Sequence, residues 1–390
     1  MPIIVILFML AILLWGQARL FGRKAFQNFE YRCSFDRPEA FEGDEIELVE
    51  EVYNRKWVPL PWFKTEITTS RWLEFAGSQS VVTYNTRFVP SFFLVKSYQK
   101  VTRRWKVKCL KRGVFPIESV ILVSTDLLGQ RVVSQKADVS ASVTVLPRTV
   151  DLDRMFVSAR YLQGDHPVRN QLIPDPFYVS GVREYQPSDP MKNIHWNATA
   201  KLGRIMIRNM EYTTRQSITV VLNMQSRQFE QGEAIDQERI EQCIRVTATL
   251  LEETLENSIP VSLASNASLE NKDKETFESA QNFGREHILS LLHTLAYFPK
   301  GSSLDFPAYL GTRGEIFPST DIQIVTPYLC EEVYDYARAA MREDKRVTIF
   351  LVGFAPSSLP DDIEINILRE LAVMQDEANG VPQKEAAAGR

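Results

Sequence analysis

The chain has 390 residues, 44% of them hydrophobic and 24% charged, which is the composition of an ordinary globular protein with one to three domains. Its formal net charge of −4 and its lack of any lysine and arginine block interleaved with aromatic residues argue against a nucleic-acid partner. The cysteines lack the close pairing of zinc or redox motifs, so we expect reduced, packed thiols at Cys33, Cys109, Cys243 and Cys330.

Residues 1–24 predict a membrane anchor. Pro2–Trp15 is almost wholly apolar, and with the residues up to Phe21 it approaches the roughly 20 residues that a membrane-spanning helix needs. Three cations follow, Arg19, Arg23 and Lys24, and by the positive-inside rule they place the soluble body in the cytoplasm, at the cell membrane. The basic start and the cleavage site of a removable signal peptide are both missing. A buried N-terminal helix is the alternative.

Residues 28–147 predict an antiparallel β-sandwich, because short alternating runs are separated by frequent turn residues. Ile46–Val52 is the clearest strand and follows the turn pair Gly43-Asp44. The same region is rich in aromatic residues, among them Trp57, Trp62, Phe63, Trp72, Phe92 and Phe93. We expect most of these rings in the core; the alternative is a loop that enters lipid beside the anchor.

Residues 148–176 mix Pro, Gly, Asp and Arg without periodicity, which is typical of a linker. From 177 to 376, strands and helices alternate, which predicts a parallel sheet with helices on both faces. The elements are expected at Ile218–Leu222, Glu238–Glu256, Val261–Leu263, His287–Phe298, Ile322–Val325, Glu331–Arg342 and Val347–Val352. Asp361–Met374 is expected to form a last helix, and residues 377–390 a flexible tail.

The stretch between residues 181 and 226 opens with Gly181–Tyr185, which is expected to form a short mixed strand, and a helix and two further strands follow. Asp189 and Pro190 provide a helix N-cap and first position, and Gly203 provides a left-handed stop. Ile205–Met210 alternates as a strand. Ile218–Leu222 has no polar face, as expected of a strand that helices cover on both sides.

Residues of this stretch resemble the bacterial domain of unknown function family fifty-eight. The matching positions are Arg183, Glu184, Tyr185, Asp189, Ile194, His195, Trp196, Ala200, Lys201, Leu202 and Gly203. Lys111–Phe115 and Asp126–Gly129 also resemble the β-domain of this family. The resemblance implies a von Willebrand factor A-like domain, association with the membrane, and a partner among the AAA+ ATPases of the MoxR type. It implies no established enzymatic activity.

A von Willebrand A domain that binds a metal has an Asp-x-Ser-x-Ser loop after its first central strand, with oxygen ligands that suit Mg²⁺. The corresponding residues here are Asn223–Arg227, which lack the anionic ligand and include a cation. After Val325, the sequence Thr326-Pro327-Tyr328 offers no carboxylate either. We therefore expect no metal and no cofactor.

The sequence favours a non-enzymatic, membrane-tethered adaptor. Open α/β sheets present their binding loops at the carboxyl ends of the strands, so Asn223, Gln225, Ser226 and Arg227 are the expected partner-binding residues. A structural network is the expected role of the family motif, namely Arg183, Glu184, Tyr185, Asp189, His195, Trp196 and Lys201.

Two alternatives belong to other classes of protein. One is a hydrolase or transferase that uses Glu184, Asp189 and His195 in an interdomain cleft. The other is a metal-dependent adhesion module outside the cell, against which the missing carboxylates and the cations after the anchor both argue.

Overall fold

A computed structural model describes residues 8–9, 26–125, 132–158, 182–185, 196–208, 216–230, 232–269, 275–299, 301–312, 317–353 and 359–368. The chain forms two compact units. One consists of Met1–Thr149 with Leu289–Phe298, and the other of Val150–Ile288 with Pro299–Arg390. Apart from Phe8 and Met9, the predicted anchor lies outside the described residues. Among those described, no helix has both the length and the apolar character needed to cross a membrane.

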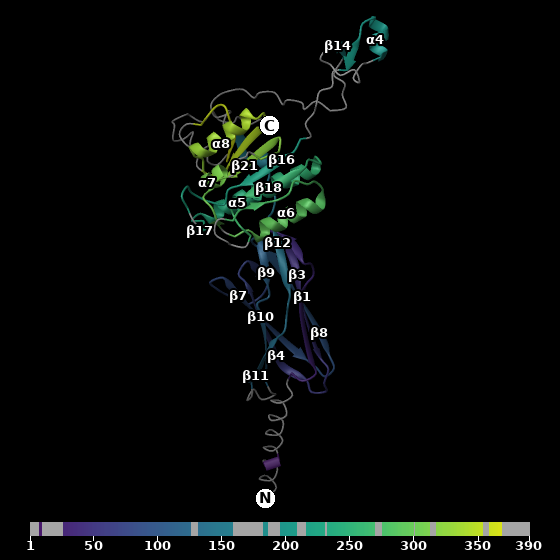
Figure 1. The fold of residues 1–390 in the computed structure, drawn as a ribbon. Helices are drawn as coiled ribbons and strands as arrows, with labels where there is room; N and C mark the ends of the chain where they lie inside the picture. The colour runs from purple at the N-terminus through teal and green to yellow at the C-terminus, as the bar shows by residue number, and fades with distance from the viewer. Residues whose placement is uncertain are drawn as a thin grey trace, which may run out of the picture. The chain divides into compact units, whose positions relative to one another are not determined.

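Three sheets make up the first unit (Figure 1). The first has the order β1 (Phe29–Phe35), β3 (Glu45–Asn54), β8 (Lys100–Cys109), β5 (Leu73–Phe75). The second has the order β11 (Val132–Ala137), β10 (Ser119–Thr125), β4 (Leu60–Ser70), β7 (Thr86–Val95), β6 (Val81–Thr83). The third has the order β2 (Glu39–Phe41), β12 (Ser142–Leu146), β9 (Gly113–Pro116).

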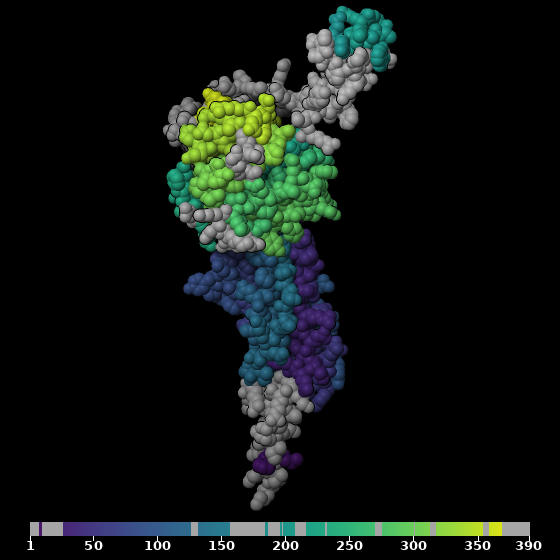
Figure 2. Space-filling model, viewed as in Figure 1, coloured from purple at the N-terminus to yellow at the C-terminus, as the bar shows by residue number. Residues whose placement is uncertain are grey.

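The described pairings within these sheets are antiparallel, apart from the parallel pairing of β2 with β12. The predicted antiparallel β-sandwich is therefore confirmed. Figure 2 shows residues from the start of this unit, in purple, packed beside later residues, in blue. β3 pairs with β8 although residues 55–99 separate the two strands.

The aromatic residues of the sandwich divide between core and surface. Phe63 and Phe93 are buried, whereas Trp57, Trp62 and Phe92 are 74%, 66% and 61% exposed. An irregularity in the register of β4 with β7, between Leu60 and Phe63, allows both of those residues to point inward while Trp62 points out. The expectation of a largely buried cluster is thus correct for only part of the set.

The predicted free cysteines are confirmed: all four are unpaired, and three are buried. Burial raises the pKa of Cys33 to about 12, and the nearby Glu50 adds to this rise. Burial also raises the pKa of Cys109 and of Cys330 to about 11. Thiols with such pKa values are poor nucleophiles at neutral pH, which fits a packing role.

A fully buried carboxylate joins the two larger sheets of the sandwich. Glu50 lies on the inward face of β3 and accepts hydrogen bonds from Tyr31 Oη at 2.8 Å and Trp105 Nε1 at 2.7 Å, both in its own sheet. It also accepts from Thr65 Oγ1 at 2.7 Å and Ser91 Oγ at 2.6 Å, both in the facing sheet. These four hydrogen bonds connect the two sheets through a single side chain.

Replacing Glu50 should therefore destabilise the sandwich strongly. Glu50→Ala leaves four donors without an acceptor, two of them in buried hydrogen bonds and two in partly buried ones, and we expect the free energy of unfolding to fall by about 3–5 kcal/mol. Denaturant unfolding followed by tryptophan fluorescence measures this, since Trp57, Trp62, Trp72 and Trp105 all lie in the sandwich.

The matched control is Glu51→Ala, which removes the neighbouring carboxylate. Glu51 pairs with Lys100 Nζ at 2.7 Å, both side chains are partly exposed, and such pairs contribute at most about 1 kcal/mol. Equal losses in the two variants would show that the buried network does not hold the sheets together.

The second unit contains a mixed, mostly parallel sheet of seven strands. Its order is β13 (Phe156–Ser158), β23 (Glu364–Leu368), β22 (Arg346–Leu351), β21 (Asp321–Thr326), β16 (Ile218–Leu222), β18 (Val261–Ser265), β19 (Phe277–Glu278). The five central strands are parallel, and the edge strands β13 and β19 are antiparallel to their neighbours. β13 lies within the passage that the sequence suggested to be a linker.

The helices described in this unit are α2 (Leu152–Met155), α4 (Trp196–Leu202), α5 (Gln237–Glu256), α7 (Phe306–Thr312) and α8 (Glu331–Arg342). α6 (Arg285–Tyr297) begins in this unit, and from Leu289 onward it belongs to the first unit. Two small sheets pair β14 (Val182–Glu184) with β15 (Met206–Arg208), and β17 (Gly232–Glu233) with β20 (Gly301–Ser302). α7 and α8 pack on one face of the large sheet, against apolar residues such as Val221, Ile324 and Ile349. α5 packs against β16 and β21.

The expected alternation of strands and helices from Ile218 to Val352 is confirmed within a few residues, but the last predicted helix is wrong. Residues 364–368 form β23, which pairs in parallel with β22. Ile363, Ile365 and Ile367 are buried and alternate with Glu364 and Asn366, which is the period of a strand with one apolar face.

Candidate functional site at the carboxyl edge of the sheet

Buried polar side chains stand where three neighbouring parallel strands end. Asn223 follows β16, Asn266 follows β18, and Thr326 is the last residue of β21. All three are fully buried. A polar group in such a place must find a hydrogen-bond partner, because water cannot reach it.

These side chains tie the strand ends to one another. Asn223 Nδ2 donates to Thr326 Oγ1 at 3.0 Å, which links β16 to β21. Asn266 Oδ1 accepts from the backbone N–H of Met224 at 2.8 Å, which links β18 to β16. Asn266 Nδ2 donates to the carbonyl oxygen of Leu304 at 2.9 Å and so fixes the segment that leads into α7.

Both the nitrogen and the oxygen of the Gln225 side-chain amide form two hydrogen bonds. Its Nε2 donates to the carbonyl oxygen of Glu230 at 2.5 Å and to Asp305 Oδ1 at 3.0 Å. Its Oε1 accepts from the backbone N–H of Phe306 at 2.6 Å and from Tyr328 Oη at 2.9 Å. Burial raises the pKa of Tyr328, so its hydroxyl stays protonated and able to donate.

Ser226 and Glu230 close the turn onto the start of α5. Glu230 Oε2 accepts from the backbone N–H of Ser226 at 2.6 Å, and Oε1 accepts from Ser226 Oγ at 2.9 Å and from Ile235 N at 2.6 Å. Ser226 Oγ accepts from the backbone N–H of Asp236, the residue that caps α5. The turn is therefore held from both sides.

The side-chain oxygens of the turn after β16 already have hydrogen-bond donors within the protein. Asn223 Oδ1 accepts from Gln225 N at 2.9 Å, and the oxygens of Gln225 and Ser226 have the partners given above. Across the described parts of the chain, no group of three or more His, Cys, Asp and Glu side chains is placed to hold a metal ion. The donor set lacks the free carboxylates that Mg²⁺ prefers.

The turn itself presents a different set of side chains to solvent. Of the four predicted partner-binding residues, Asn223, Gln225 and Ser226 are buried, and Arg227 is exposed. Phe229 is 80% exposed and adopts a left-handed backbone conformation with φ of 64°, which is unusual for a bulky residue. Partner binding by the four residues stays a prediction. Phe229 was not among them, and its exposure in the structure makes it a further candidate.

The family motif is described in part. Glu184 and Arg204 form an ion pair of 3.5 Å, and both side chains are more than half exposed. Trp196 is 70% exposed, and Gly203 ends α4 with φ of 66°, as its sequence position predicts. Of the remaining motif positions, Asp189 and His195 lie outside the described residues, Arg183 belongs to β14, Tyr185 is half-buried, and Lys201 is exposed on α4.

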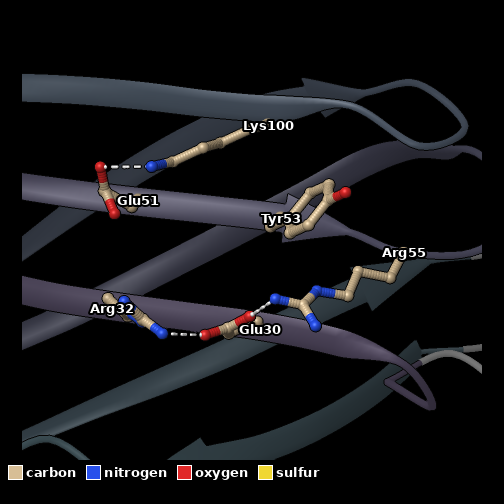
Figure 3. A pocket seen from close by; sticks show the side chains of 6 residues that line it. All are labelled: Glu30, Arg32, Glu51, Tyr53, Arg55 and Lys100. Atoms are coloured by element: carbon tan, nitrogen blue, oxygen red, sulfur yellow. Dashed lines mark hydrogen bonds and ion pairs between the residues drawn. The ribbon is translucent and has the colours of Figure 1, made fainter.

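A hollow of about 220 Å³ on the outer face of the first sandwich sheet is lined by charged residues (Figure 3). Arg32 and Arg55 both point to Glu30, with N–O distances of 2.5 and 2.6 Å, and Lys100 points to Glu51. Because these exposed charges satisfy one another, the hollow is typical of an ordinary solvated strand surface.

Comparisons with known proteins identify one domain. Residues 181–370 match the family described as "Protein of unknown function DUF58". No curated protein matches the chain significantly.

Similar solved structures cover the chain only in part. A non-cellulosomal cohesin from the archaeon Archaeoglobus fulgidus is 12% identical, with a TM-score of 0.21, over 30% of this chain and 91% of that one. A cohesin–dockerin complex from Clostridium thermocellum is 9% identical, with a TM-score of 0.21, over 31% and 100%. The sporulation control protein Spo0M from Bacillus subtilis is 11% identical, with a TM-score of 0.19, over 30% and 49%. Such low scores carry no argument about function.

Gln225→Ala should destabilise the second unit, because it removes four hydrogen bonds from a buried position. We expect a loss of about 2–4 kcal/mol in unfolding free energy. Hydrogen exchange should also speed up at the N–H of Phe306, which loses its acceptor.

The matched control is Gln228→Ala. Gln228 lies three residues further along and is only half-buried, so the free energy of unfolding should change by less than about 0.5 kcal/mol. Similar losses in both variants would contradict the network as a stabilising element.

Proposed function

Since residues 181–370 are a domain of the DUF58 family, we propose that the protein is a membrane-tethered, non-enzymatic adaptor. In this proposal the parallel sheet is a metal-independent von Willebrand A-like domain that docks a partner at its carboxyl edge. The partner that the family resemblance implies is an AAA+ ATPase of the MoxR type.

The observation that carries the proposal is the exposed pair Arg227 and Phe229 on a rigid turn. Aromatic and arginine side chains contribute most to protein–protein interfaces, and their contribution is greatest when little order has to be imposed on binding. Here Gln225, Ser226 and Glu230 hold the turn with buried hydrogen bonds. The two exposed side chains are therefore presented from a pre-organised support.

The complete hydrogen bonding of the polar side chains at the carboxyl edge also supports a role without catalysis. A general base or nucleophile needs a free lone pair that a substrate can reach, and a general acid needs an accessible proton. At the carboxyl edge the polar atoms of Asn223, Gln225 and Ser226 are buried and bonded to one another. The alternative, a hydrolase or transferase using Glu184, Asp189 and His195, gains no support from Glu184, whose exposed side chain pairs with Arg204.

Exposed aromatic residues on the sandwich support the tether. Trp62, Phe92 and Leu94 are each more than 60% exposed and line a hollow of about 630 Å³ on the outer face of the second sheet. Phe26, two residues after the predicted anchor, packs on Phe63 with ring centroids 6.5 Å apart. The chain thus joins the sandwich beside this apolar surface, and tryptophan is favoured where a protein meets the membrane interface.

Purification of the full-length tagged protein in mild detergent, followed by mass spectrometry, tests the partner. We expect an AAA+ ATPase in near-stoichiometric amount with the unmodified chain. The double variant Arg227→Glu/Phe229→Ser should recover at least about tenfold less ATPase, as expected when an arginine and an aromatic anchor are lost together.

The matched control is the double variant Phe283→Ser/Arg285→Glu. Both residues are exposed and lie just after Asn282, which bridges to the first residue of β18 at the opposite edge of the sheet. This variant should retain the ATPase. Equal recovery with the carboxyl-edge variant would refute docking at that edge, and a small metabolite or metal retained instead of any ATPase would refute the adaptor role.

Cell fractionation tests the tether. Removing residues 2–24 should move the protein from the membrane to the soluble fraction, because this apolar segment is the part able to span the hydrocarbon core. Removing residues 377–390 is the control truncation and should leave the protein in the membrane fraction. A chain without residues 2–24 that still fractionates with the membrane would contradict the anchor.

A further inference from the structure

The second unit has a hollow at the opposite edge of its sheet, where the parallel strands begin. Its volume is about 300 Å³. It lies between the last turns of α5 and the starts of four strands, which contribute Ile218, Asp321, Arg346 and Glu364.

The sheet is polar on the face that lines this hollow. Asp321 and Gln323 of β21 stand beside Arg346 and Thr348 of β22, their register partners. The intervening residues, such as Ile322, point to the opposite face and pack in the core with α7 and α8. Parallel sheets are ordinarily apolar on both faces, so a polar row needs a specific explanation.

Asp321 is buried without a hydrogen-bond partner for one of its oxygens. The residue is 7% exposed, and its Oδ1 is a buried acceptor that no donor in the described structure reaches. Gln323 Oε1 is also buried and has no hydrogen-bond donor in the described structure. Asp321 is the stronger observation, since both of its oxygens accept, whereas an amide can be rotated to present either atom. A buried carboxylate oxygen without a donor destabilises a fold, and perturbed ionisable groups of this kind cluster at functional sites.

The groups that face Asp321 compensate its charge only in part. Arg346 on β22 is the only cation lining the hollow among the described residues, and its Nη2 pairs with Glu364 Oε2 of β23 at 3.1 Å. Glu253 of α5 adds a carboxylate, and that helix has no basic residue in its last turn, where its dipole is negative. Burial raises the pKa of Asp321 to about 6, against the lowering effect of Arg346, and Glu364 raises it further.

We propose that this hollow binds a positively charged group that donates hydrogen bonds, a primary ammonium or a guanidinium, with Asp321 as its counter-ion. Both unpartnered atoms are acceptors, so the ligand must supply donors. A hard metal ion fits poorly, because it takes six or more oxygen ligands and no cluster of acidic side chains is gathered within the described residues. The proposal does not depend on the adaptor function.

Calorimetry of the full-length chain with two probes tests the site and distinguishes two sources of the group. Spermidine represents a free polyamine, and N-acetyl-arginine methylamide represents an arginine side chain of a polypeptide. We expect one saturable site per chain for at least one probe, and the tighter probe indicates the source. Magnesium chloride at the same ionic strength should give no saturable heat.

The charge of Asp321 should decide the binding. Asp321→Asn keeps the shape and removes the charge, so affinity should fall at least about tenfold. Asp335→Asn, an exposed site on α8, is the control with the same change of charge and should bind normally. In the unmodified chain, binding should weaken as the pH falls through about 6, because Asp321 becomes neutral.

Stability measurements report whether the variant is folded. The pKa of Asp321 is raised in the folded state, so the stability that its neutral form contributes is present at low pH and is lost as pH rises through about 6. At neutral pH, Asp321→Asn should therefore have a higher melting temperature than the unmodified chain, with the difference shrinking in acid.

Three results would overturn the proposal. One is the absence of saturable heat from both probes up to about 10 mM, a range in which even weak binding is measurable. Another is equal affinity in Asp321→Asn. The third is binding by the unmodified chain that does not weaken as the pH falls, which holds even if the variant fails to fold.

Discussion

The carboxyl edge of the sheet depends on one constraint, that polar groups buried where parallel strands end must find partners inside the protein. Asn223, Asn266 and Gln225 meet it with their own amides, which join three strand ends and the segment before α7. Because an amide both donates and accepts, these three residues cross-link backbone and side chains through hydrogen bonds alone. The result is a rigid turn from which Arg227 and Phe229 project.

Two buried carboxylates elsewhere in the chain differ in whether the protein supplies hydrogen-bond donors to them. Glu50 accepts four hydrogen bonds and joins the sheets of the sandwich. Asp321 has an oxygen without any partner among the described residues and lines a hollow. The protein alone satisfies the first carboxylate, whereas in our proposal a ligand supplies the donor that the second lacks. Burial alone therefore does not distinguish a structural carboxylate from a binding one; the number of donors does.

The sequence predicted which residues lie at the carboxyl edge of the sheet, but not that their side chains are buried and hydrogen-bonded to one another. The buried run Ile218–Leu222 predicted where a central strand would end, and so that Asn223 and Gln225 would lie at its edge. It did not predict that these side chains would be inaccessible, because their partners are distant in the sequence: Tyr328 is 103 residues from Gln225. The misassigned helix at Asp361–Met374 has a similar origin, since its isoleucines alternate only over the few residues of β23.

By itself the sequence determined the β-sandwich, the alternation of strands and helices, and the presence of a DUF58 domain, because periodicity and motif are properties of neighbouring residues. Only the tertiary structure decided which polar side chains are saturated, which are exposed and which are left without a partner. Hydrogen bonds at strand ends join residues from separate strands, and no local pattern records which strands will be neighbours.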